Sequence, residues 1–144
     1  MKKSFEQVKY EASGKNDWDD QQAKKQLLKS EDALQSICFK WANNNYCLKI
    51  HNPRCRIFSV PNGGLRNKIE AMKLQATGLT AGVSDMIVLY PNGLCVFFEA
   101  KAENGKQSPA QKDFEESVIK LGFNYELFYT FDDFKAKFTK YITP

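Results

Sequence analysis

Asp85, Glu99 and Lys101 are the residue types that a metal-dependent hydrolytic site requires. Two neighbouring carboxylates repel each other, and a hard divalent cation bound between them removes that cost. A lysine beside the ion can orient a water or stabilise negative charge that develops on a phosphate. An aspartate followed at a distance by Glu-x-Lys is nevertheless a short and degenerate pattern, and a charged strand end with one Glu–Lys pair explains it equally well. The surrounding elements have to decide between these interpretations.

The three side chains fall at the open end of a predicted β-hairpin. Residues 86–90 (MIVLY) and 94–98 (LCVFF) are β-branched and aromatic runs, and Pro-Asn-Gly at 91–93 separates them. This turn signal predicts an antiparallel hairpin in which residue 85 lies opposite residue 99. Strand side chains alternate between faces, so the glutamate and lysine of Glu-x-Lys point the same way. The sequence therefore predicts that two carboxylates and an ammonium converge at the end of an apolar sheet.

The rest of the chain predicts an α/β fold in the order α-β-α-β-β-α-β-α, a mixed sheet flanked by helices. Ser30 is a good N-cap for a first helix, which we expect Asn43-Asn44-Asn45 to end. The other elements are expected as a strand at 54–60, a helix with a basic face at 65–77, a helix after Ser108, a strand at 123–129 and a final helix after Thr130.

The helix after Ser108 has a well-defined start. Serine can cap it, Pro109 suits its first position, and Gln111 can close a capping box. This box explains the glutamine fully without any function in a site. The apolar stripe of the helix is expected to consist of Ala110, Phe114, Val118 and Leu121.

Length and composition predict one folded domain at 30–144, preceded at 1–29 by a polar N-terminal arm or an added helix. The chain has 144 residues, of which 42% are hydrophobic, enough for a core. A net charge of +4 is a mild basic bias that suits a polyanionic partner. We expect no membrane association and a cytoplasmic location, because no apolar run approaches a membrane span and no apolar segment follows Met1-Lys2-Lys3.

Cys47, His51 and Cys55 are spaced four apart, as metal ligands on a helix can be. Asn52-Pro53 would interrupt such a helix, and the spacing matches none of the usual zinc patterns. Buried thiols and a loop histidine are therefore favoured over a zinc site. None of the four cysteines forms a Cys-x-x-Cys pair, which agrees with thiols in a reducing compartment.

Several motifs follow one another in a fixed order. They are residues 30–35 (SEDALQ), 60–64 with Arg66 (VPNGG), 78–85 (GLTAGVSD), 97–101 (FFEAK) and 105–111 (GKQSPAQ). Together they resemble the VRR-NUC branch of the PD-(D/E)XK nucleases over about residues 30–130. One departure is Ser84, which stands where that family usually has a proline before its metal-binding aspartate. This position shapes the backbone rather than the metal. The resemblance implies a restriction-endonuclease-like PD-(D/E)XK core.

The resemblance also implies roles for individual residues. Asp85 and Glu99, with the backbone carbonyl of Ala100, would bind Mg²⁺ or Mn²⁺, and Lys101 would position the attacking water. Glu31 would ligate through water or help to hold a second ion, although a first-turn glutamate is also favoured by the helix dipole alone. Gln111 would belong to the catalytic site as well as to the capping box. DNA contacts would come from Gln35, Asn62, Arg66, Lys68 and Lys73; for the basic residues the alternative is a solvated helix face.

The function implied is that of a divalent-metal-dependent DNA endonuclease. Small chains of this family resemble phage-encoded proteins, which would act in the cytoplasm of a bacterial host, and the family is associated with cutting branched DNA. Symmetric cutting of a four-way (Holliday) junction needs two active sites, which predicts a homodimer. Two alternatives stay open: a nuclease for flap, nicked or single-stranded DNA, and a non-catalytic nucleic-acid-binding module.

Overall fold

A four-stranded mixed sheet forms the centre of the computed structural model, which describes residues 30–61 and 67–142. Its strands lie side by side in sequence order: β1 (Arg56–Ser59), β2 (Met86–Leu89), β3 (Cys95–Ala100) and β4 (Asn124–Phe128). β1 and β3 both pair antiparallel with β2, and β4 pairs parallel with β3. The element order confirms the α-β-α-β-β-α-β-α arrangement that the sequence predicted.

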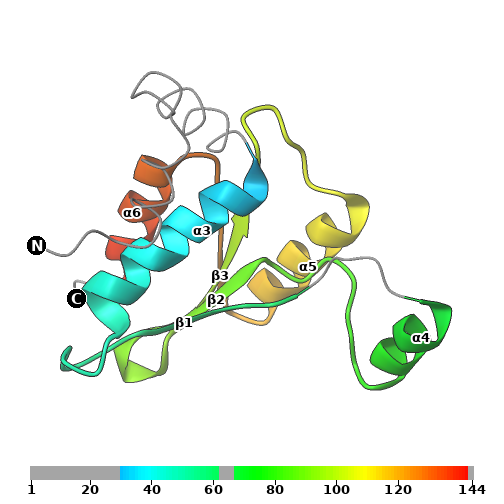
Figure 1. Ribbon diagram of the computed structural model, residues 1–144, viewed down its shortest axis with the longest axis horizontal. Coiled ribbons are helices and arrows are strands. Elements are labelled where there is room, and N and C mark those ends of the chain that lie inside the picture. Colours follow the sequence, from blue (N-terminus) through cyan, green and yellow to red (C-terminus); the bar gives the residue numbers. More distant parts are fainter. Residues whose placement is uncertain (1–29, 62–66, 143–144) are drawn as a thin grey trace, which may run out of the picture.

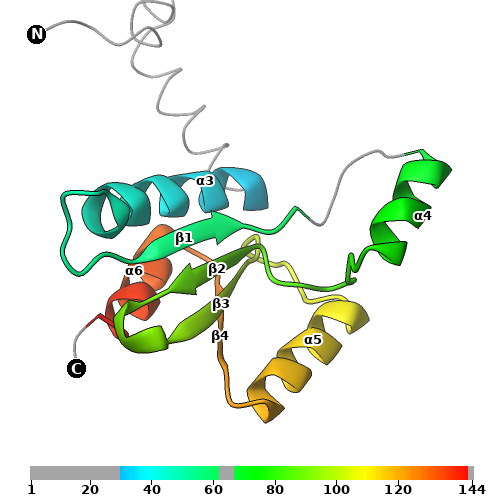
Figure 2. The same ribbon diagram turned by 90° about the horizontal axis from the view of Figure 1, so that it is seen from below.

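Helices cover both faces of this sheet. α3 (Glu31–Ala42) and α6 (Phe131–Thr139) lie on one face, and α5 (Pro109–Lys120) lies on the other (Figures 1 and 2). α5 also makes the crossover that a parallel β3–β4 pair requires. The main core lies between the sheet and the α3–α6 layer, where Phe98, Phe134 and Phe138 are fully buried.

The capping residues act as the sequence predicted. Ser30 accepts a hydrogen bond from the Ala33 amide, and Thr130 accepts one from the Asp133 amide. Ser108 opens α5 with a complete capping box. These contacts satisfy backbone donors that a helix start leaves free, so each helix begins where its cap stands.

One expectation about the helices is met only in part and another is wrong. The first α-helix ends at Ala42 with Asn43 as its C-cap, as the sequence predicted, but Asn43–Cys47 prolong the helical backbone as a π-helical turn. Burial of Cys47 and a hydrogen bond of 2.8 Å from Asn45 Nδ2 to the Trp41 carbonyl outweigh the weak helix propensity of asparagine there. Leu121 does not join the apolar stripe of α5. It is the C-cap residue and is 73% exposed, because the helix ends there, before the chain turns back into β4.

The first strand and the helix after it are shorter than expected. β1 spans four residues within the expected 54–60. α4 (Lys68–Ala76) lies within the expected 65–77 and buries none of its residues. It stands apart from the sheet (Figures 1 and 2), and Ile69 and Met72 are 67% and 68% exposed. The described residues therefore include one helix whose apolar side chains face away from the core.

None of the helices in the described ranges is both long enough and apolar enough to cross a bilayer.

Candidate active site

The two acidic residues of the hairpin face each other at its open end. Met86 pairs with Phe98 in the β2–β3 register, which sets Asp85 opposite Glu99 as the sequence predicted. The Asp85 amide donates to Glu99 Oε2 at 3.2 Å, and the Ala100 amide donates to Asp85 Oδ2 at 2.8 Å. Each carboxylate is therefore oriented by a backbone amide of the opposite strand.

Lys101 joins this pair from the residue after β3. Its Nζ lies 3.6 Å from Glu99 Oε1 and 3.9 Å from Glu31 Oε1, and the residue is only 6% exposed. The Lys101 amide donates to the Phe128 carbonyl at 3.0 Å, so β4 holds the backbone at this position. The ammonium is thus buried among carboxylates on a rigid sheet.

Glu31 reaches the same place from the first turn of α3. Its Oε1 accepts a long hydrogen bond, 3.4 Å, from the Ala102 amide, in addition to its contact with Lys101. The structure therefore brings together residues that lie 70 positions apart in the chain. Glu31 contacts the lysine and the backbone that follows Glu-x-Lys, rather than the carboxylates themselves.

Gln111 serves the helix cap and the acidic pair at once. Its side-chain oxygen accepts from the Ser108 amide at 2.9 Å, which closes the capping box, and its Nε2 donates to Glu99 Oε1 at 2.6 Å. Gln111 can therefore cap α5 and contact Glu99 at the same time, because the first contact uses its side-chain oxygen and the second uses Nε2. The start of α5 is tied to Glu99 through this one side chain.

The glycine-rich segment before Asp85 packs against the start of α5. A Cβ at Gly82 would lie 2.2 Å from the Ala110 carbonyl oxygen, and Gly82 has a φ of +79°. Only glycine accommodates both this close approach and this backbone angle. Ser84, in place of the family's proline, is fully buried and donates to the Met86 carbonyl at 3.2 Å. The segment thereby fixes where Asp85 enters the site.

Burial controls the ionisation of the two carboxyl groups. It raises the pKa of Glu99 to about 7, with a further contribution from the negative charge of Asp85. Burial also raises the pKa of Asp85, which the hydrogen bond from the Ala100 amide partly offsets. Two partly buried carboxyl groups facing each other favour either a shared proton or a bound cation.

The donor set fits a hard divalent ion held in part by water and substrate. Asp85 and Glu99 supply two carboxylates, the number with which Mg²⁺ is usually bound. In the described part of the chain no three or more His, Cys, Asp or Glu residues group as ligands, so a protein cage of the zinc type is not formed there. A third protein carboxylate would therefore have to act through water, as expected for Glu31.

The residues considered for zinc have other environments. His51 Nδ1 accepts a hydrogen bond from the Leu48 amide at 3.0 Å. Burial raises the pKa of Cys47 to about 11 and also raises that of Cys55, so both are thiols at neutral pH.

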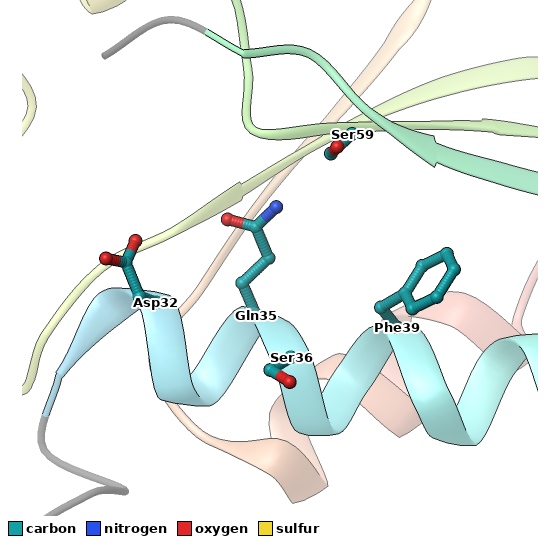
Figure 3. A pocket seen from close by; sticks show the side chains of 5 residues that line it. All are labelled: Asp32, Gln35, Ser36, Phe39 and Ser59. Carbon is teal, nitrogen blue, oxygen red and sulfur yellow. The ribbon is translucent and has the colours of Figure 1, made fainter. Parts of the chain in front are cut away.

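The residues expected to contact DNA are spread over two elements. Gln35 lines a hollow of about 320 Å³ between α3 and β1, and its side chain extends toward Ser59 (Figure 3). Lys68 and Lys73 are exposed on α4. Asn62 and Arg66 lie outside the described residues, as does the expected arm at 1–29.

Sequence reasoning missed a group of basic residues at the other end of β1. Lys49, Arg54 and Arg56 line a second hollow, of about 330 Å³. They belong to a loop and a strand start that carry no motif, so only their charge could have marked them.

The raised carboxyl pKa values predict a pH-dependent stability in EDTA. Burial in the folded chain raises the pKa of Glu99 from its ordinary value of 4.5 to about 7. The folded state therefore binds this proton more tightly than the unfolded state does. The resulting stabilisation is fully present at low pH and is lost as pH rises through 7. Thermal unfolding should show the wild type losing about 1 kcal/mol, or about 3 °C, from pH 6 to pH 8.

Asp85→Asn is the matched variant for this measurement. It keeps an oxygen for the Ala100 amide but removes the neighbouring charge, so its stability should fall less over the same interval. A wild-type melting temperature that rises from pH 6 to pH 8 would contradict the prediction.

Comparison with solved structures identifies the fold. A structure titled "VRR_NUC domain protein" superposes with a TM-score of 0.60 at 24% identity, covering 78% of this chain and 87% of that one. A second, titled "VRR_NUC domain", covers 74% of this chain and 95% of its own at 20% identity, with a TM-score of 0.49. No protein-family model and no curated protein matches the chain. The first likeness confirms the fold that the sequence motifs implied.

Proposed function

We propose that this chain, which has a VRR-NUC domain fold, is a divalent-metal-dependent DNA endonuclease. The observation that carries the proposal is the grouping of Asp85, Glu99 and Lys101 at the end of the hairpin, each held by backbone hydrogen bonds. A buried lysine within 4 Å of Glu99 and of Glu31 is costly as a mere structural feature. It is well suited to phosphodiester hydrolysis.

Asp85 and Glu99, with the Ala100 carbonyl, would hold Mg²⁺ or Mn²⁺. Such an ion polarises a phosphate oxygen and lowers the pKa of a bound water. The cross-strand amide bonds hold each carboxylate in place, which would limit the reorganisation needed when the substrate arrives.

Lys101 would orient the attacking water and offset negative charge in the transition state. Its contacts with Glu31 Oε1 at 3.9 Å and with Glu99 Oε1 at 3.6 Å restrain the flexible ammonium from two carboxylates. Glu31 would thus position Lys101, besides reaching an ion through water. Gln111 would fix the rotamer of Glu99 by its 2.6 Å hydrogen bond.

Branched DNA is the substrate that we propose, with a four-way junction cut by a homodimer. One chain carries one site, and paired cuts need two sites related by symmetry. The exposed apolar residues of α4 support an interaction with a partner, because surfaces of this kind mark contact sites. Light scattering after size exclusion should give twice the chain mass.

Cleavage of a substrate panel tests the function itself. Four-way, flap, nicked, single-stranded and plain duplex DNA are incubated with Mg²⁺, with Mn²⁺ and with EDTA. We expect ion-dependent products, and most product from the four-way substrate. Preferred cutting of flap or single-stranded DNA would replace the junction assignment. DNA binding without product at any enzyme excess would favour the non-catalytic binding module.

Gln111→Glu separates the two functions of Gln111. The glutamate can still accept from the Ser108 amide and close the capping box, but it cannot donate to Glu99 and adds a charge beside it. We expect cleavage to fall about 10- to 100-fold with an unchanged melting temperature in Mg²⁺. Thr130→Ala, which removes the cap of α6 instead, should lower the melting temperature without a comparable loss of rate. Full activity of Gln111→Glu would leave only the capping role.

A further inference from the structure

A basic pocket lies at the end of the sheet away from the candidate active site. Lys49, Arg54 and Arg56 line it, together with Asn43, and no aspartate or glutamate is among its lining residues. Arg56 pairs with Leu89 at the start of β1, whereas Ser59, at the other end of β1, pairs with Met86 beside Asp85. The length of the strand therefore separates the basic pocket from the acidic pair.

The charges of this pocket are uncompensated within the described part of the chain. None of the three side chains forms an ion pair there, although lysines elsewhere, such as Lys135 and Lys137, do so. Clustered like charges favour a bound anion, which lowers their mutual repulsion. Two guanidinium groups and an ammonium are the donors that proteins use most for phosphate.

A groove between α3 and β1 lies between this pocket and the candidate active site. Asp32, Ser36 and Phe39 line it from α3, with Ser59 across from them on β1 (Figure 3). Asn43 of the basic pocket follows Phe39 at helical spacing, so both hollows lie along one side of α3. α3 runs alongside β1 in both ribbon views (Figures 1 and 2). The two hollows therefore follow one another along α3, from its first turn to Asn43, and we call this succession the tract.

The length of the tract is set by the helix. From Glu31 to Asn43 is twelve residues, or about 18 Å at 1.5 Å per residue. One DNA strand carries a phosphate about every 3.4 Å along the duplex axis. The tract therefore spans about five phosphates. Asp32 follows Glu31 at the active-site end of the tract and makes that part of the groove unfavourable for phosphate, so beyond the scissile phosphate the backbone contacts are expected at the far end, in the basic pocket.

We propose that the Lys49–Arg54–Arg56 pocket binds backbone phosphates of a DNA arm about five base pairs from the scissile bond. The inference rests on the proposed DNA endonuclease function and names a second contact for the same substrate. Contacts of this kind set affinity and orientation without reading sequence. The pocket would hold the arm along the α3–β1 groove while the hairpin end cuts it.

The salt dependence of binding tests the proposal. Affinity of the full chain for a labelled four-way junction with 12-bp arms is measured by fluorescence anisotropy in EDTA at a series of salt concentrations. The affinity falls as salt rises, and removing two phosphate contacts in Arg54→Ala/Arg56→Ala should make the slope of log K against log salt shallower by about 2. Binding at 0.1 M salt should weaken roughly 60-fold, as expected for about two fewer released counterions.

Two control variants separate charge from position. Arg54→Lys/Arg56→Lys keeps both charges and should keep the slope. Lys120→Ala removes an exposed charge at the end of α5, on the other face of the sheet, and should leave both slope and affinity unchanged. Thermal unfolding of each variant verifies that it is folded.

Neutral phosphates locate the contact on the DNA. Single methylphosphonate substitutions about five positions from the mapped cleavage bond should weaken the wild type but not Arg54→Ala/Arg56→Ala. An unchanged slope in the double alanine variant, or sensitive phosphates confined to the cleavage bond, would overturn the proposal even if the wild type cleaves DNA. A wild type that neither binds nor cuts any DNA would overturn the proposed function together with it.

Discussion

Asp85→Asn and Lys101→Ala should each reduce metal-dependent cleavage by on the order of 10³-fold, while DNA binding in EDTA survives. Asp85→Asn keeps an acceptor for the Ala100 amide, 2.8 Å away in the wild type, so the hairpin end should stay folded. The variant lacks the negative charge that would hold the ion. Lys101→Ala keeps both carboxylates but removes the ammonium that lies 3.6 Å from Glu99 Oε1.

Matched exposed residues provide the controls. Lys106→Ala removes a lysine five positions further along, and Asp113→Asn neutralises an exposed aspartate of α5. Both should cleave at the wild-type rate. Initial rates under saturating Mg²⁺ and anisotropy in EDTA separate chemistry from binding. Wild-type activity in either site variant would show that the substituted residue is not part of the catalytic site. If Lys101→Ala does not fold, the activity of Asp85→Asn alone decides the test.

The hairpin shows what local sequence patterns can predict. The two apolar runs and the Pro91–Gly93 turn between them predict the hairpin, and its register puts Asp85 opposite Glu99. The capping box at Ser108 is equally local, because all its atoms lie within four residues. In both cases the interactions that determine the structure lie within a short stretch of chain, so the local sequence is enough to predict them.

Contacts between elements that are far apart in the chain could not be predicted from a local sequence pattern. The approach of Glu31 to Lys101 depends on how α3 lies across the sheet, and its sequence signature is an ordinary first-turn glutamate. Only the resemblance to a known family pointed to it. For Gln111 the local sequence shows the cap, and again only the resemblance pointed to the site; that the side-chain nitrogen reaches Glu99 follows from the packing of α5.

Burial explains why the helical backbone extends beyond the predicted end. The asparagines at 43–45 have the composition of a helix end and the α-helix does end at Ala42, yet Cys47 is drawn into the core and Asn43–Cys47 continue as a π-turn. This turn leads into the loop that carries Lys49 and Arg54, so it helps to form the basic pocket. The pocket could not be predicted, because it follows from tertiary packing that overrides a local preference.

Gly82→Ala should destabilise the fold and impair cleavage together. A Cβ there would lie 2.2 Å from the Ala110 carbonyl oxygen and 2.7 Å from the Gln111 amide nitrogen, both backbone atoms at the start of α5. The helix start can relieve this clash only by moving away, and Gln111 would then leave Glu99. A φ of +79° adds backbone strain. We expect a loss of about 3 kcal/mol or more in unfolding free energy.

Gly93→Ala is the control that isolates the close approach. Gly93 has nearly the same backbone angle, with a φ of +78°, but nothing lies within 4 Å of its Cβ position, and it stands at the opposite end of the hairpin. It should therefore lose only about 1 kcal/mol and retain its rate of cleavage once folded. Urea unfolding and cleavage rates well below both melting temperatures are the measurements. Equal losses in the two variants would mean that strain alone matters, and that the glycine-rich segment does not hold α5 against the active site.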